Sequence, residues 1–450
     1  MTFSSTSFLF FFFPIVFLSY FIIKNRTYRN VVLLLASLFF YAWGEPVYIV
    51  LMLAASLIAY LGGIVMEKTR FRKTALVITL VLLVSNLFVF KYLNFLCDNI
   101  GVNIPTIALP IGISFYTFQI ISYVADLYKG KVALQRNFFY LTLYVSFFPQ
   151  LIAGPIVRYQ TIEEEILNRN ESLDGVVKGL RRFTVGLAKK VIIANNVALV
   201  CTDVYDGGKE FGTAMYWLAA VCYALQIYFD FSGYSDMAIG LGKMFGFNFL
   251  ENFNYPYIAD SVTDFWRRWH ISLSSWFRDY IYIPLGGNRC KPYRHIFNIC
   301  AVWALTGLWH GASWNFVLWG IYYAALLLLE KYLLGKLLSK CPKIIRWLYT
   351  MFFVLISWVI FDRTDFSSMT NALVTMFTFR PTDWNAVFLE NTSILTGLLF
   401  LPIGVLSMFP ISKKVKLPDI LANILTLAAL FVCIVFIISS SFNPFIYFRF

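Results

Sequence analysis

Charged residues are scarce in this 450-residue chain, making up 14% of it against 59% for hydrophobic residues. This composition excludes a soluble globular protein and indicates an integral membrane protein. Few apolar runs reach 18 residues unbroken, but many of roughly 15–25 residues hold only one or two polar positions, the length of a spanning helix. Strand-like alternation is absent, which argues against a transmembrane barrel. We therefore predict an all-α, polytopic helical bundle with about eleven or twelve crossings, plus shorter re-entrant or interfacial helices.

Several sequence motifs typical of enzymes and metal sites are also missing. The seven cysteines are scattered and form no C-x-x-C pair, which argues against a disulfide framework or a cysteine metal site. No G-x-S-x-G, Walker A or G-x-G-x-x-G motif occurs, and the nearest approach, Gly233–Met237, lacks the second glycine. A histidine metal site would need His270, His295 and His310 to converge, yet His295 lies in a basic loop of the sequence. We expect no bound metal, no other bound cofactor and no nucleic-acid partner.

The net charge of +13 fits the topology of a membrane protein, because Lys and Arg collect in cytoplasmic loops. Attraction of an anionic, phosphate-bearing thioester is a second interpretation of the same charge. Met1–Ile23 lacks the features of a cleaved signal peptide and predicts a retained first helix, which the basic cluster Lys24–Arg29 orients with the N-terminus outside. The charges of Arg158–Arg294 are too dense for plain spanning helices, so we expect re-entrant or interfacial helices there. No internal repeat is evident, which favours a single membrane domain over residues 1–450.

The stretch Trp309-His310-Gly311 lies inside the apolar run Ala301–Leu329. An imidazole at membrane depth is costly unless it is hydrogen-bonded or faces a water-lined cavity, so such groups tend to mark function. Burial favours the neutral imidazole, which can accept a proton. Gly307 and Gly311 would let a ligand or another backbone approach His310 closely. The alternative is that His310 only hydrogen-bonds a neighbouring helix.

A second histidine lies in Asp264–Tyr280, where the spacing predicts one amphipathic helix. Residues at steps of three and four form a stripe that includes His270: Trp266, His270, Leu273, Phe277 and Tyr280. Asp264 can pair with Arg268 one turn on, and Pro284–Gly287 would end the helix. An interfacial helix with Trp and Arg anchors would explain the stripe and the arginines, but not a histidine placed within the stripe.

Two further features accompany these histidines. Asp230 and Asp236 lie in otherwise apolar sequence, so they need partners, and Arg267 or Arg268 are the candidates for a structural ion pair. Seven of the twelve tryptophans fall in Trp266–Trp319, whereas an aromatic belt would spread them over all helix ends. Some of them would line a tunnel, although packing is the more frequent role of any single tryptophan.

With these residues, the chain resembles the membrane-bound O-acyltransferase family, and most closely the bacterial branch that O-acetylates polysaccharides such as alginate. The matching segments form a core at residues 110–325, while the flanks match only in hydropathy and layout: SFFPQLIAGPIVRY (Ser146–Tyr159), YFDFSGYSDMAIGL (Tyr228–Leu241), ENFNYPY (Glu251–Tyr257), FWRRWHISLSSWFRDYIYIPLGGNR (Phe265–Arg289) and TGLWHGASWNFVLWG (Thr306–Gly320). The resemblance implies a transmembrane acyltransferase with a central funnel. His310 would lie at its centre, and His270 matches the family's second marked polar residue.

The resemblance further implies an enzyme that takes an acetyl group from a cytoplasmic thioester, acetyl-CoA, for O-acetylation of an extracellular or periplasmic polysaccharide. His310 would act as general base on the attacking hydroxyl, a role worth about 10²–10⁴-fold in rate. His270 would position the donor or hydrogen-bond the thioester carbonyl. Candidates for donor binding are Trp266, Arg267, Trp269, Ser313, Trp314 and Asn315. We expect a multi-pass protein of the bacterial cytoplasmic membrane that works with an exported, hydrolase-like acetyltransferase.

The C-terminal tail, residues 441–450, carries a further candidate. Tyr447 lies in an F-x-Y-x-x-F pattern that resembles a C-terminal motif of related acyl-transfer systems, in which a tyrosine relays the acyl group to an exported partner. A phenol can act as a nucleophile once a base removes its proton, so Tyr447 would accept the acetyl group if the tail reached His310. The alternative is an aromatic anchor at the membrane interface.

Other functions remain open. D-alanyl transfer to teichoic acid shares the fold, but the unbroken IPLGGNR run at Ile283–Arg289 is closer to the acetyltransferase branch. A transporter or flippase for a lipid-linked sugar predicts a wide polar cavity, whereas the sequence offers few intramembrane polar residues. A purely structural subunit of a polysaccharide export complex would leave His310 replaceable without loss of acetylation.

Overall fold

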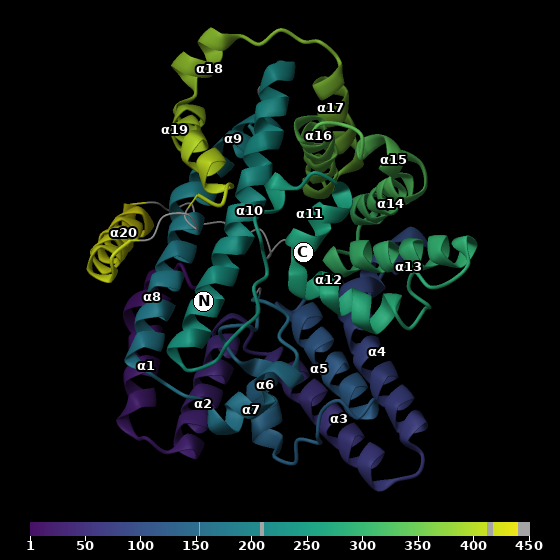
Figure 1. Ribbon diagram of the computed structural model, residues 1–450, viewed down its shortest axis with the longest axis vertical. Coiled ribbons are helices and arrows are strands. Elements are labelled where there is room, and N and C mark those ends of the chain that lie inside the picture. Colours follow the sequence, from purple (N-terminus) through teal and green to yellow (C-terminus); the bar gives the residue numbers. More distant parts are fainter. Residues whose placement is uncertain (153, 208–210, 412–416, 440–450) are drawn as a thin grey trace. The chain divides into compact units, whose positions relative to one another are not determined.

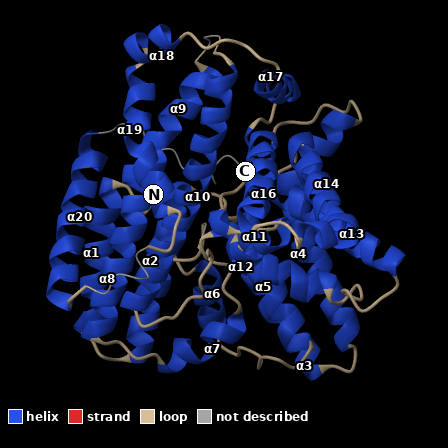
Figure 2. Cartoon of the chain, turned by 45° about the horizontal axis from the view of Figure 1, so that its top comes forward, coloured by secondary structure: helices blue, strands red, loops and turns tan. Residues whose placement is uncertain are grey.

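The computed structural model describes residues 1–152, 154–207, 211–411 and 417–439, and this part of the chain contains helices and loops but no strand (Figure 2). The all-α prediction is confirmed.

Contacts within the chain divide it into two compact units. One holds Met1–Phe183 and Tyr234–Leu250, and the other holds Thr184–Gly233 and Glu251–Phe450. The boundaries fall inside two long helices, α8 (Leu173–Ala188) and α10 (Thr213–Met244), each of which has residues in both units. The single domain expected over residues 1–450 stays a prediction.

The first unit contains most of the N-terminal helices (Figure 1): η1 (Phe8–Phe12), α1 (Phe13–Ile22), α2 (Arg26–Gly44), α3 (Ile49–Lys68), α4 (Arg72–Asn99), α5 (Ile113–Tyr128), α6 (Phe138–Ser146) and α7 (Tyr159–Asn168). Helices α3, α4 and α5 pack against one another, and α2 packs against α1 and α6. Asparagine side chains begin two of these helices, because Asn25 accepts a hydrogen bond from the N–H of Tyr28 and Asn137 accepts from those of Phe139 and Tyr140.

The second unit holds the two histidines of interest. Its helices are η2 (Lys189–Ala194), α9 (Asn195–Asp206), η3 (Pro256–Ile258), α11 (Val262–Arg268), α12 (Ile271–Phe277), η4 (Arg278–Tyr282), α13 (Pro292–His310), α14 (Trp314–Leu329), η5 (Glu330–Leu334), α15 (Gly335–Leu338), α16 (Lys343–Asp362), α17 (Phe366–Phe377), α18 (Trp384–Glu390), α19 (Thr392–Ser407) and α20 (Asp419–Ser439). Helix α14 packs against both α13 and α16, while α9 packs against α19. His310, the last residue of α13, contacts the rings of Trp319 in α14 and Phe361 in α16, so the C-terminal end of α13 lies beside both helices.

Seven helical segments of the described chain are long and apolar enough to cross a membrane: Ile49–Lys68, Arg72–Asn99, Leu173–Asp206, Thr213–Met244, Trp314–Leu338, Lys343–Asp362 and Asp419–Ser439. The apolar surface of α20 fits contact with lipid, since Ile420 is 77% exposed and Phe431 is 68% exposed. Seven is fewer than the eleven or twelve crossings expected. The reason is that several apolar runs form helices too short to qualify, including α5 with 16 residues and α6 with nine.

We expected re-entrant or interfacial helices in Arg158–Arg294, but two of the seven segments, Leu173–Asp206 and Thr213–Met244, lie there. Their buried charges are paired. Lys190 Nζ lies 2.5 Å from Asp230 Oδ1 in the second unit, and Arg182 Nη2 lies 2.5 Å from Asp236 Oδ1 in the first. The prediction that Arg267 or Arg268 would pair with these aspartates is therefore wrong.

Candidate active site

A break between two short helices positions His270. Helices α11 and α12 are separated by Trp269 and His270, so the single helix predicted over Asp264–Tyr280 is wrong. His270 has a left-handed backbone with φ 44°, and Tyr255 is the other non-glycine residue with positive φ in the described part of the chain. Such a conformation costs of order 1–3 kcal/mol and persists only where the surroundings enforce it. The predicted pair within α11 is confirmed, with Arg268 Nε 2.8 Å from Asp264 Oδ2.

The segment Asn252–Asn254 enforces this break. In a continuous helix, the N–H of Ser272 would donate to the carbonyl of Arg268. Instead, the Arg268 carbonyl accepts from the N–H of Asn254 at 2.9 Å, and the N–H of Ser272 donates to Asn252 Oδ1 at 3.1 Å. The N–H of Ile271 donates to the Asn252 carbonyl at 2.9 Å. The backbone groups that would have continued the helix are thus held by residues from another part of the chain.

The His270 ring is almost completely buried, with 1% of the residue exposed. It packs edge-on against Phe231 at 4.6 Å between ring centroids, and Nδ1 lies 3.1 Å from Asn252 Oδ1. Nε2 has no hydrogen-bond partner within the described residues. Because the ring is buried, and because His310 is nearby, the pKa of His270 is well below its ordinary value. His270 is therefore neutral at pH 7.

His310 is the last residue of α13 and is 6% exposed. Its ring packs edge-on against Trp309 at 5.0 Å, Trp319 at 5.2 Å and Phe361 at 5.1 Å. Trp309 also packs against His270 at 5.9 Å. The structure therefore brings the two predicted histidines against the same indole ring, although they are 40 positions apart in the sequence.

The glycines beside His310 serve the packing of α14. A Cβ atom at Gly307 would lie 2.3 Å from the carbonyl oxygen of Phe316, and one at Gly311 would lie 2.3 Å from the Phe316 ring. Real Cβ contacts are essentially never this short, so any side chain at either position would push α14 away. Of the two uses expected for these glycines, the structure shows close approach of another backbone.

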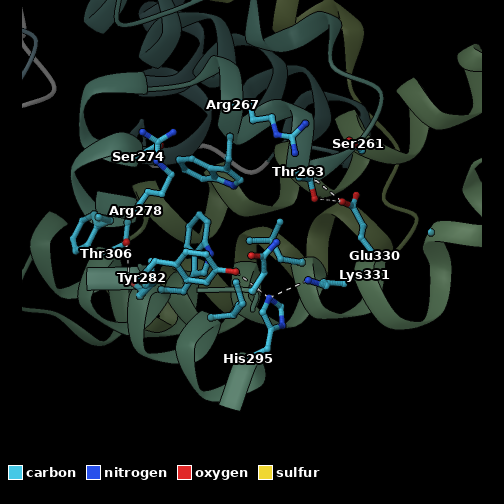
Figure 3. Close-up of a pocket in the computed structure, with 18 of the residues that line it drawn as sticks. Ser261, Thr263, Arg267, Ser274, Arg278, Tyr282, His295, Thr306, Glu330 and Lys331 are labelled. Atoms are coloured by element: carbon cyan, nitrogen blue, oxygen red, sulfur yellow. Dashed lines mark hydrogen bonds between the residues drawn. The ribbon is translucent and has the colours of Figure 1, made fainter. Parts of the chain in front are cut away.

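A cavity of about 900 Å³ opens in the second unit (Figure 3). Its wall reaches the neighbours of both histidines, because Ile271 follows His270 directly and Thr306 lies one helical turn before His310. Tryptophans form part of the wall, since Trp266 and Trp303 line the cavity and pack edge-on with 4.7 Å between ring centroids. Some of the clustered tryptophans thus line a cavity, as expected, and also pack against one another.

The charged side chains in the lining of this cavity are mainly basic. The cationic side chains are Arg267, Arg278, Lys331 and Arg346, and the two acidic ones are Asp260 and Glu330. Both acids are engaged: Asp260 Oδ2 lies 2.9 Å from Arg346 Nη2, and the Glu330 carboxylate accepts hydrogen bonds from the N–H groups of Val262 and Thr263 at the start of α11. The free surface of the cavity therefore favours an anionic ligand.

His295 also lines this cavity, and its position corrects the expectation of a histidine in a basic loop. It lies in the first turns of α13 and is 4% exposed. Figure 3 shows Tyr282 and Lys331 directed toward its ring, with Tyr282 Oη 3.1 Å and Lys331 Nζ 3.2 Å from Nε2. Nδ1 lies 3.0 Å from Tyr332 Oη. Burial and, secondarily, Lys331 lower the pKa of His295, so it is a neutral part of the wall.

Comparison with known proteins places this arrangement in a family. The model of the membrane-bound O-acyltransferase family matches residues 133–369, a range that contains both histidines, the cavity and Asn252. The chain belongs to this family. It is accordingly an O-acyltransferase and a multi-pass membrane protein.

Three relatives illustrate the match. The chain is 39% identical over 430 residues to the probable alginate O-acetylase AlgI of Azotobacter vinelandii, which covers 92% of this chain and 85% of that protein. It is 36% identical over 416 residues to the peptidoglycan O-acetyltransferase of Helicobacter pylori, covering 83% of this chain and 79% of the relative. A teichoic acid D-alanyltransferase of Bacillus subtilis is 31% identical over 231 residues, covering 48% of this chain and 58% of the relative.

The residues of this O-acyltransferase that were predicted to bind the donor do not all lie at the cavity. Trp266 and Arg267 line the cavity, whereas the other four donor-binding candidates are not among its lining residues. Trp269 is buried against Phe265 and Trp358, and Asn315 Nδ2 donates to the carbonyls of Ile360 and Phe361: both tie helices together. Ser313 precedes α14, and Trp314, its first residue, is 61% exposed. Tyr447 and the tail 441–450 lie outside the described residues.

Sequence reasoning missed three residues of the site: Asn252, Glu330 and Lys331. The sequence did contain an indication for Asn252, because it lies in ENFNYPY, one of the segments that resemble the O-acyltransferase family. The sequence also contained an indication for Glu330, because an acidic residue at the end of the apolar run Ala301–Leu329 requires a partner. Nothing in the local spacing indicated that Lys331 would contact His295.

Proposed function

We propose that this O-acyltransferase transfers an acetyl group from acetyl-CoA on the cytoplasmic side of the bacterial cytoplasmic membrane, for O-acetylation of an extracellular or periplasmic polysaccharide. The observation that carries the proposal is the pair of buried histidines on Trp309, next to a basic cavity of about 900 Å³. The names of the relatives at 36–39% identity, alginate O-acetylase and peptidoglycan O-acetyltransferase, support acetyl transfer to a polysaccharide. The D-alanyltransferase covers only about half of the chain, which makes D-alanyl transfer the weaker candidate.

His310 would act as the general base. A neutral imidazole removes the proton from the attacking hydroxyl while the hydroxyl oxygen bonds to the thioester carbonyl carbon. The tetrahedral intermediate then collapses, the carbon–sulfur bond breaks, and the proton on His310 passes to the departing thiolate. His310 thereby returns to its neutral state. Packing by Trp309, Trp319 and Phe361 holds the ring in one orientation, which general-base catalysis requires.

The basic cavity would hold the donor. Acetyl-CoA carries phosphate groups, and guanidinium and ammonium groups bind phosphate through short, charge-assisted hydrogen bonds. Arg267 and Lys331 are the cations best placed for this role, because both line the cavity and neither forms an ion pair within the described residues. The volume of about 900 Å³ lies within the usual range of small-molecule and cofactor sites.

Release of free thiol from acetyl-CoA by the purified protein tests this function. The unchanged protein in detergent should release thiol, and His310→Ala should release less than about a tenth as much, given the usual size of a general-base contribution. A transporter or flippase would release no thiol at all, and a structural subunit would behave in the same way. Replacing acetyl-CoA by a D-alanyl thioester distinguishes acetyl transfer from D-alanyl transfer.

The route outward would involve a second protein that presents the polysaccharide. We expect an exported, hydrolase-like acetyltransferase to take the acetyl group at the outer side. Tyr447 would be the relay between His310 and that partner if the tail reaches the site.

A further inference from the structure

Asn252 is completely buried, and its side chain lies at the centre of the hydrogen bonds around His270. Its Oδ1 atom is 3.1 Å from the backbone nitrogen of Ser272, 2.8 Å from Ser272 Oγ and 3.1 Å from His270 Nδ1. The Asn252 side-chain oxygen therefore contacts three groups: two of Ser272, which lies in α12, and the ring of His270, which directly precedes α12.

These contacts fix the orientation of the Asn252 amide. A backbone N–H can only donate, so the atom that faces Ser272 must be the amide oxygen and not the amide nitrogen. The reversed amide would place two donors against each other in a buried site. The position of the oxygen thus follows from the backbone, independently of how the histidine is protonated.

The orientation of the amide in turn fixes the tautomer of His270. An amide oxygen only accepts, so Nδ1 must carry the ring hydrogen when the imidazole is neutral. The lone pair of the neutral ring is then on Nε2. This atom is buried and has no hydrogen-bond partner within the described residues, whereas buried polar atoms in folded proteins are generally hydrogen-bonded. A substrate group that donates a hydrogen bond would supply the missing partner.

We propose that Asn252 is a positioning residue that holds His270 as the Nδ1–H tautomer, so that Nε2 accepts a hydrogen bond from an O–H or N–H group of a substrate. The inference rests on the acetyltransferase function proposed above. It changes the role expected for His270, because a neutral Nε2 cannot donate a hydrogen bond to the thioester carbonyl. The donating group is either the hydroxyl of the acyl acceptor or an amide N–H of the pantetheine arm of the donor.

The substitution Asn252→Asp tests this role through pH dependence. It keeps an acceptor oxygen beside Ser272 and Nδ1–H, but adds a negative charge that favours the imidazolium form of His270. Imidazolium has no lone pair on Nε2, so activity should be lost at a higher pH than in the unchanged protein. We expect the acid limb of the kcat profile for acetyl transfer to a hydroxyl compound to move upward by about one pH unit or more, with activity recovered on the alkaline side.

Two controls separate this effect from a general disturbance. Asn137→Asp adds the same charge at an exposed helix cap in the first unit, where aspartate caps as well as asparagine, and should keep the unchanged profile. Asn252→Ala removes the oxygen without adding charge. In folded protein it should lower kcat for acetyl transfer to a hydroxyl compound by about 10–100-fold at every pH, the size of effect seen when a partner that orients a metal-ligating histidine is lost.

Two assays identify the source of the donating group. If it is the pantetheine amide, Asn252→Ala raises KM for acetyl-CoA in thiol release without any acceptor. If it is the acceptor hydroxyl, that KM is unchanged and only acetyl transfer to a hydroxyl compound falls.

For acetyl transfer to a hydroxyl compound, an acid limb that does not move in active Asn252→Asp protein would overturn the inference, and so would an unchanged kcat in folded Asn252→Ala protein. If Asn252→Asp fails to accumulate, the result for Asn252→Ala decides. Absence of thiol release by the unchanged protein would instead refute the proposed function, and this inference with it.

Discussion

Replacement of Lys190 by methionine should destabilise the second unit by about 3–5 kcal/mol, the usual cost of removing one member of a buried ion pair. Lys190 Nζ lies 2.5 Å from Asp230 Oδ1, and the two side chains are only 4% and 3% exposed. At this separation the attraction is about 7 kcal/mol for an effective dielectric constant near 20, a value offset in the folded protein by the loss of hydration of both ions. Lys190→Met removes the attraction but leaves the Asp230 carboxylate in its buried position.

Thermal or denaturant unfolding of the purified protein in detergent would measure the loss. The control is Lys178→Met, which removes an exposed pair: Lys178 Nζ lies 2.7 Å from Asp174 Oδ2, with side chains 61% and 71% exposed. Exposed pairs contribute about 0–1 kcal/mol, so this variant should unfold almost like the unchanged protein. The double variant Lys190→Met/Asp230→Leu should recover part of the stability, because no buried charge of the pair remains. Equal losses for Lys178→Met and Lys190→Met, or no recovery in the double variant, would refute the pairing.

Three further predictions concern the site. Arg267→Ala and Lys331→Ala should each raise KM for acetyl-CoA several-fold with little change in kcat, and an unchanged KM in both, measured by thiol release, would remove the cavity from donor binding. Gly307→Ala should lower the unfolding temperature and kcat together, because its Cβ would lie 2.3 Å from the Phe316 carbonyl oxygen; wild-type stability would show that α13 and α14 are not so closely packed. Tyr447→Phe should keep thiol release but abolish polysaccharide acetylation if the tail relays the acetyl group, whereas full acetylation would favour the aromatic anchor.

The helical architecture follows from sequence features that act locally. Helix α2 ends at Gly44 and α3 begins at Ile49, and the sequence Gly44-Glu45-Pro46 at their junction is typical of a turn. The Asp264–Arg268 pair was also predictable, because residues four apart in a helix are neighbours. His310 stood out as a histidine in an apolar run, and its burial agrees with that pattern.

The details around His270 depend on a distant segment and could not be derived from local spacing. The helical period through residues 264–280 is regular, but Asn252 and Asn254 take the backbone hydrogen bonds that would continue the helix. The aspartate partners were missed for the same reason. Lys190 and Arg182 reach Asp230 and Asp236 from other helices, whereas the sequence drew attention to the nearby arginines of α11.

The role proposed for His310 is general-base catalysis of the acetyl transfer that modifies a polysaccharide. Its most direct test is the base-labile acetate on extracellular polysaccharide from cells that produce either the unchanged protein or His310→Ala, compared at equal amounts of protein in the membrane. We expect acetate in the His310→Ala cells to fall below about a tenth of the unchanged level, because the general base is lost while the helix remains intact. Retention of more than about a tenth at equal protein would contradict this role of His310.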